Sequence, residues 1–148
     1  MRHAKSSWDD PALGDHSRPL NARGLRDGPR VARALEARGW SPGRIVASDA
    51  VRARSTADKV AHALHDAPKV ELDPGLYHAS ASYILNLARR RVGDAPLLLV
   101  GHNPGMADAV SRLAETNLDM PTASVALFQN RGGGWRLVEQ IRPRDLAA

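Results

Sequence analysis

The feature that most constrains the fold is the apolar run Leu97-Leu98-Leu99-Val100, which leads directly into Gly101-His102-Asn103-Pro104. A strand that has no polar face is buried on both sides, as in a parallel sheet covered by helices. Asn103 is predicted to cap a helix that extends to about residue 114, with Pro104 as its first residue. The sequence therefore predicts a strand–loop–helix unit that places His102 where the strand ends.

The rest of the chain repeats this alternation. Further strands are predicted over 44–48, 69–72, 124–129 and 135–141, and further helices over 21–38, 50–65 and 80–92. Asn21 caps the first helix, unless Pro29 breaks it and Asp27 is the true cap. Gly132-Gly133-Gly134 turns between the last two strands, which gives an antiparallel hairpin at the sheet edge. We expect a single domain over residues 1–148, an α/β/α sandwich of three layers with a mostly parallel sheet.

The composition bounds the kind of protein. It is 43% hydrophobic and 25% charged, which are globular values, and it contains no cysteine. Disulfides, thiolate metal sites and cysteine nucleophiles are therefore excluded, which suits a cytoplasmic protein. No stretch approaches the roughly 20 apolar residues that cross a bilayer, and no signal peptide is visible.

The net charge of +5 would attract anionic partners. The arginines are scattered, however, and one Phe and two Tyr offer little surface for base stacking. We therefore expect phosphorylated partners rather than nucleic acid or membrane.

Three segments that carry histidine or arginine are predicted to meet at one edge of the sheet. Arg2-His3 lies at the amino terminus, Arg52 follows the strand over 44–48, and His102 follows the leucine-rich strand. Ligands bind beyond the carboxyl ends of parallel strands, where such segments meet. A neutral imidazole can attack phosphorus, and a guanidinium can hold phosphoryl oxygens. Two histidines without a carboxylate pattern make a poor metal site, so we expect no metal.

A set of motifs with this chemistry occurs in one order along most of the chain. The segments are Arg2-His3-Ala4-Lys5-Ser6-Ser7-Trp8, Arg18-Pro19-Leu20-Asn21 with Gly24, Ser48-Asp49-Ala50-Val51-Arg52 with Thr56-Ala57, Leu76-Tyr77-His78-Ala79 and Val100-Gly101-His102-Asn103-Pro104. In these motifs the chain resembles the histidine phosphatase superfamily, and most of all its small phosphohistidine phosphatases of the SixA type.

The resemblance implies a role for each matching residue. His3 would be the nucleophile that accepts the phosphoryl group, and Arg2 and Arg52 would bind its oxygens. His102 would donate a hydrogen bond to the phosphoryl group, and Ser6 would add another. No cofactor is implied, because fixed donors supply most of the stabilisation in phosphoryl transfer.

The chain also departs from its larger relatives, which carry a mid-chain Glu or Asp that protonates the leaving group. The corresponding region, Asp73-Pro74-Gly75-Leu76-Tyr77-His78, has no clear equivalent. An imidazole leaving group needs little help from an acid, whereas an alkyl phosphate needs one. We therefore favour phosphohistidine on a phosphocarrier or phosphotransfer protein as the substrate. A small phosphorylated metabolite is the second candidate, and a non-catalytic phosphate-binding module of the same fold is the rival from another class.

The start of the chain is unusual for this family. Relatives reach the Arg-His pair through an apolar strand of about five residues inside the sheet, whereas only Met1 precedes Arg2 here. A missing internal strand leaves unpaired backbone groups on its neighbours. We therefore expect a truncated first strand, and our hypothesis is that the natural chain starts further upstream.

Overall fold

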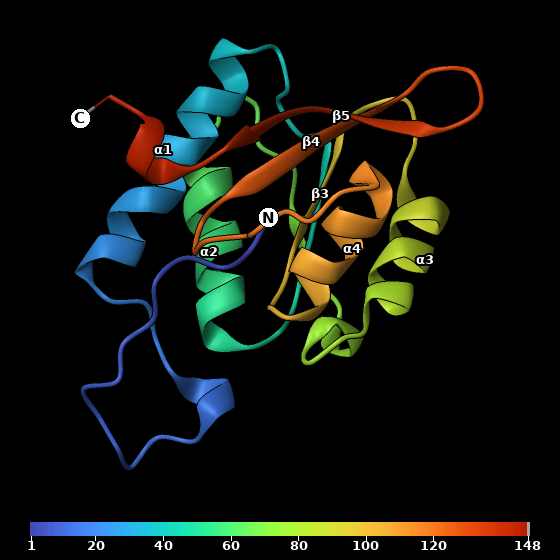
Figure 1. Ribbon diagram of the computed structural model, residues 1–148. Coiled ribbons are helices and arrows are strands. Elements are labelled where there is room, and N and C mark those ends of the chain that lie inside the picture. The colour runs from blue at the N-terminus through green and yellow to red at the C-terminus, as the bar shows by residue number, and fades with distance from the viewer. Residues whose placement is uncertain (148) are drawn as a thin grey trace.

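The computed structural model describes residues 1–147 and contains two sheets and four α-helices (Figure 1). Three parallel strands lie in the order β2-β1-β3, and their bounds are Arg44–Ala47 for β1, Val70–Leu72 for β2 and Leu97–Val100 for β3. An antiparallel pair consists of β4 (Val125–Asn130) and β5 (Trp135–Ile141). The helices are α1 (Ala22–Ala37), α2 (Val51–Ala63), α3 (Ala81–Arg91) and α4 (Gly105–Ala114). Short 3-10 turns cover Asp15–Ser17 (η1), Pro74–Leu76 (η2) and Pro143–Asp145 (η3).

Helices cover both faces of the parallel sheet, as Figure 1 shows. Alternate strand residues such as Ile45 and Leu98 pack with α1 and α2 in one apolar cluster. Val46 and its neighbours on the opposite face pack with α3 and α4 in a second cluster. This arrangement confirms the predicted α/β/α sandwich. Among the residues described, no helix combines the length and apolar character needed to span a membrane.

The helix starts follow local sequence signals in two cases. The side chain of Asn21 accepts a hydrogen bond from the Gly24 backbone N–H at 2.9 Å, so Asn21 is the cap of α1 and Pro29 lies inside the helix. The alternative cap, Asp27, is wrong. Ser80 caps α3 in the same way, through the Tyr83 N–H. These bonds satisfy backbone donors that a helix leaves unpaired in its first turn.

The predicted start of α4 is wrong by one residue. The helix begins at Gly105, and Pro104 occupies the cap position that was expected for Asn103. Asn103 thus lies one residue before the cap, but its side chain still contacts the first turn. Its carbonyl oxygen accepts from the Ala107 N–H at 3.2 Å, while its amide donates to the Met120 carbonyl at 2.9 Å.

The first strand is truncated, as expected. Arg2 forms a single parallel bridge with Gly101, and its N–H donates to the Ser124 carbonyl at 3.0 Å, so the first residues join β3 to the loop before β4. Further along, β3 and β4 belong to separate sheets. The space between them is a cavity of about 670 Å³, lined by Leu97–Leu99, by Val125–Asn130 and by helix side chains.

This cavity corrects one expectation about β3. Leu98 and Val100 are buried, but Leu97 and Leu99 are only half-buried. The run was predicted to be covered on both faces. Its second face is incompletely covered because the space between β3 and β4 holds this cavity and no strand of residues 1–147.

Candidate active site

The structure brings His3 and His102 together at the carboxyl ends of the parallel strands. Their ring centroids lie 5.1 Å apart, and both side chains are buried. Backbone bonds fix this pairing, because the His3 N–H donates to the Gly101 carbonyl at 3.0 Å and the Gly101 N–H donates to the Met1 carbonyl at 3.0 Å. Each histidine is therefore held by the chain segment that carries the other.

The hydrogen bonding of His3 leaves one ring nitrogen available as a nucleophile. Its Nδ1 lies 2.7 Å from the Ala4 carbonyl oxygen. A carbonyl only accepts hydrogen bonds, so Nδ1 carries the proton and Nε2 carries the free electron pair. Burial lowers the pKa of His3 to about 4, and the charges of three nearby arginines act in the same direction, although the hydrogen bond to Ala4 opposes them. The imidazole is therefore neutral near pH 7, as a nucleophile must be.

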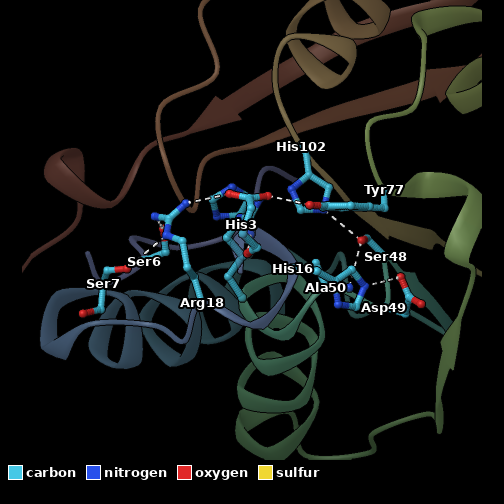
Figure 2. Close-up of polar contacts among 12 residues, drawn as sticks. His3, Ser6, Ser7, His16, Arg18, Ser48, Asp49, Ala50, Tyr77 and His102 are labelled. Carbon is cyan, nitrogen blue, oxygen red and sulfur yellow. Dashed lines mark hydrogen bonds and ion pairs between the residues drawn. The ribbon is translucent and has the colours of Figure 1, made fainter. Parts of the chain in front are cut away.

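His102 is oriented by Ser48, which lies at the end of β1. Its Nε2 is 2.8 Å from the Ser48 hydroxyl oxygen, as Figure 2 shows. That oxygen already accepts from the Ala50 N–H at 3.2 Å, so its proton is free to point at Nε2. Nδ1 then carries the ring proton, and this buried atom has no partner among the residues described. Burial, followed by the repulsion between the protonated forms of His102 and His3, lowers the pKa of His102 to about 3.

Two of the arginines at the site are almost fully buried. Arg52, in the first turn of α2, hydrogen-bonds to the Asp15 carbonyl at 2.7 Å and to its carboxylate at 2.9 Å. Arg18 hydrogen-bonds to the Ser7 carbonyl and to the Ser6 hydroxyl, and its Nη1 lies 3.1 Å from the Asp15 carboxylate. In Figure 2, His3 lies between Arg18 and His102.

The sequence also proposed Arg2 and Ser6 for phosphate binding, and each of them has its own hydrogen-bond partner. Arg2 directs one N–H to the Met120 carbonyl at 3.2 Å, and its buried Nε has no partner among residues 1–147. Burial, and then the charge of Arg52, lowers the pKa of Arg2. The Ser6 oxygen accepts from Arg18, which leaves the hydroxyl proton free for donation to a bound anion.

Sequence reasoning missed several residues that line this site. Arg18 was part of a recognised motif but received no role, and Asp15 lies in a segment that reads only as a loop. Tyr77 donates to the Asp15 carboxylate at 2.6 Å, and its ring packs edge-on against His102 at 5.4 Å. The motifs that contain Arg18 and Tyr77 were the available signals, although neither residue received a role from them. Asp15 gave none, because its contact with Tyr77 exists only in the folded chain.

Two further histidines border the site. His16 lies 3.0 Å from the Asp49 carboxylate, and His78 stacks on Tyr77 with 3.9 Å between ring centroids. Within the described chain, no group of three His, Asp or Glu side chains is arranged to hold a metal ion. Neither His3 nor His102 lines the cavity between β3 and β4.

Comparisons with known proteins agree with this geometry. The family model described as Histidine phosphatase superfamily (branch 1) matches residues 1–83. An uncharacterized chloroplastic protein of Arabidopsis thaliana is 35% identical over 146 residues, which cover 91% of this chain and 66% of that relative.

Two solved structures are similar over almost their whole length. One, from Agrobacterium tumefaciens, is assigned as the phosphohistidine phosphatase SixA, with a TM-score of 0.83, 28% identity and coverage of 97% of this chain and 95% of that chain. The other is the protein histidine phosphatase SixA complexed with tungstate, with a TM-score of 0.81, 25% identity and coverage of 98% and 96%.

The fold and the paired histidines define a histidine-dependent phosphatase. The chain belongs to the histidine phosphatase superfamily, and within it the chain is similar to the SixA group.

Proposed function

We propose that this phosphatase hydrolyses phosphohistidine on phosphocarrier or phosphotransfer proteins, through a phosphohistidine intermediate on His3. The observation that carries the proposal is the state of the carboxylate beside the site. Asp15 accepts hydrogen bonds from Tyr77, Arg52 and Arg18, so it is held as an anion. An anion cannot protonate a leaving group, and a substrate whose leaving group is an imidazole needs the least help.

The reaction proceeds by two displacements. In the first, His3 Nε2 forms a bond to phosphorus while the bond from phosphorus to the substrate imidazole breaks, and the substrate nitrogen takes up a proton from solvent. In the second, water attacks phosphorus and the bond to His3 Nε2 breaks, which restores the neutral imidazole. One proton of the water stays on the departing phosphate and the other passes to solvent. Arg2 and Arg52 would bind the phosphoryl oxygens, together with the Nδ1–H of His102 and the hydroxyl of Ser6.

The surface beside the site supports a protein substrate. The Trp8 side chain is 72% exposed, and the Arg18 guanidinium lies 3.2 Å from its ring centroid. An exposed aromatic ring next to a phosphate site offers contact area to a partner that displays the phosphate. The lack of cysteine suits a cytoplasmic partner.

A substrate panel tests this proposal. We would compare a phosphohistidine-bearing carrier protein with small alkyl phosphates, at equal concentrations and with His3→Ala as the blank. We expect kcat/KM for the carrier protein to exceed that for the esters by about 100-fold, because the leaving groups differ in basicity. Preference for an ester would favour a metabolite phosphatase, and binding without turnover of either substrate would favour a phosphate-binding module.

A further inference from the structure

The loop before α1 places one carboxylate among the arginines of the site. Asp15 is the first residue of η1, a turn in which no residue is buried. Its side chain is 43% exposed, whereas those of Arg52 and Arg18 are 6% and 8% exposed. The carboxylate thus reaches from an exposed loop to two buried guanidinium groups.

The two arginines depend on this carboxylate to different degrees. Arg18 has other partners, since it also bonds to Ser6 and Ser7 and stacks on Trp8. For Arg52, both side-chain hydrogen bonds found among residues 1–147 go to Asp15, one to its backbone oxygen and one to its carboxylate. A guanidinium held at two points by one residue has a defined plane, and it loses one of these points when the carboxylate is removed.

The carboxylate is suited to orient the arginine and not to exchange protons. The hydrogen bond from Tyr77, and after it those from Arg52 and Arg18, holds the pKa of Asp15 well below its usual range, although partial burial acts in the opposite direction. Asp15 therefore stays ionised throughout the neutral range. Its charge is constant while a phosphate binds and leaves.

We propose that Asp15 is a positioning residue, which fixes the Arg52 guanidinium in the orientation that binds the phosphoryl group carried by His3. This inference rests on the proposed function, because it takes Arg52 to be a phosphate ligand. Tyr77 has a supporting part, since its hydroxyl donates to the same carboxylate oxygen that Arg52 contacts.

A double-mutant cycle on orthophosphate binding tests the proposal. Calorimetry would give the dissociation constant of orthophosphate for the wild type, Asp15→Asn, Arg52→Ala and the double variant. We expect Asp15→Asn to weaken binding about 10-fold in the wild type and by less than about twofold in the Arg52→Ala background. Unchanged or tighter binding to Asp15→Asn would overturn the proposal, and so would an equal loss in both backgrounds.

Two further variants control for charge and folding. Asp10→Asn removes the same charge from the same loop, at a residue whose carboxylate contacts the Ala12 N–H, and should leave orthophosphate affinity unchanged. If Asp15→Asn does not fold, Tyr77→Phe takes its place. We then expect binding to weaken about threefold through loss of one hydrogen bond to Asp15, and unchanged affinity would contradict the proposal.

The wild type separates this inference from the proposed function. A wild-type protein that binds orthophosphate but leaves phosphohistidine intact would disprove the substrate, and the cycle would still decide the role of Asp15. A wild-type protein that binds no orthophosphate would overturn both.

Discussion

The two ends of β3 are held in different ways. At the carboxyl end, the first residues of the chain take the place of a strand. The N–H groups of Arg2, His3 and Gly101 each donate to a backbone carbonyl at 3.0 Å. At the amino end, β3 and β4 face each other across a cavity of about 670 Å³. The buried ammonium of Met1 is the last group of the first segment that bonds to β3, and it lies 2.8 Å from the Leu99 carbonyl.

This difference shows that the site is supported locally. His3 and His102 are positioned by Gly101, Ser48 and the Ala4 carbonyl, and all of these lie at the carboxyl ends of the strands. The cavity removes packing area from the opposite end without removing any of these bonds. We therefore expect changes at the cavity to alter stability, and changes at the histidines to alter turnover.

His3→Ala gives the largest expected effect, and it should affect only the carboxyl end of β3, where the site lies. Turnover of any substrate should fall at least about 1,000-fold, because the group that accepts phosphorus is gone. Orthophosphate should still bind, since the arginines remain, and the melting temperature should not fall. Unimpaired hydrolysis by this variant would disprove the proposed nucleophile.

Filling the cavity should affect only the other end. We would join five β-branched residues to Met1, so that they extend back between β3 and β4. The added strand should raise the free energy of unfolding by roughly 2 kcal/mol or more, through buried apolar area and edge hydrogen bonds. A Gly/Ser extension of equal length is the control. Equal stability of the two proteins in urea, or a large change in kcat, would contradict the separation of the two ends.

The groups at the two ends of β3 should change the stability of the protein over different pH ranges. Burial lowers the pKa of the Met1 ammonium from 8.0 to about 5, and those of His3 and His102 from 6.5 to about 4 and about 3. Each folded pKa lies below its unfolded value, so the unfolded chain binds more protons and stability rises with pH. From about pH 7 to 8 Met1 contributes most of the rise, with a slope of up to about 1.4 kcal/mol per pH unit that falls to about half at pH 8. Below about pH 7 the histidines should steepen the slope.

Urea titrations at several pH values measure these slopes. Acetylation of the Met1 amino group should remove most of the rise above pH 7 and leave the contribution of the histidines below it. Identical profiles of the acetylated and unmodified proteins between pH 7 and 8 would show that the ammonium is not buried at the cavity.

Ser48→Ala should give the smallest effect, and it tests whether Ser48 orients His102. Removing the hydroxyl leaves His102 Nε2 without its partner, and one hydrogen bond of about 1 kcal/mol corresponds to a fall of about fivefold in kcat. Ser7→Ala, which removes an exposed hydroxyl that accepts from the Asp9 N–H, is the matched control and should leave kcat unchanged. An equal effect of both substitutions would argue against orientation of His102 by Ser48.

Much of the fold could be predicted because its signals are local. The leucine-rich run gave β3, the apolar spacing gave α2, and the Asn21 side chain marked the start of α1. The meeting of Arg2-His3, Arg52 and His102 also followed, since parallel strands end at one edge of a sheet.

The rest could not be predicted because it depends on contacts between distant segments. Asp15 reaches Arg52 across 37 positions of sequence, and Tyr77 reaches Asp15 across 62, so no local pattern could reveal either contact. The apolar run alone also did not predict the incomplete burial of Leu97 and Leu99, although the single residue before Arg2 did predict a truncated strand beside it.

The central claim, that His3 carries the phosphoryl group, is tested most directly by trapping the intermediate. The wild type and His3→Ala would be mixed briefly with a labelled phosphohistidine donor, quenched in base and analysed by peptide mapping. We predict acid-labile, base-stable label on the peptide that contains His3 in the wild type and none in the variant. Label on another residue, or turnover by the wild type without any labelled enzyme, would contradict the account.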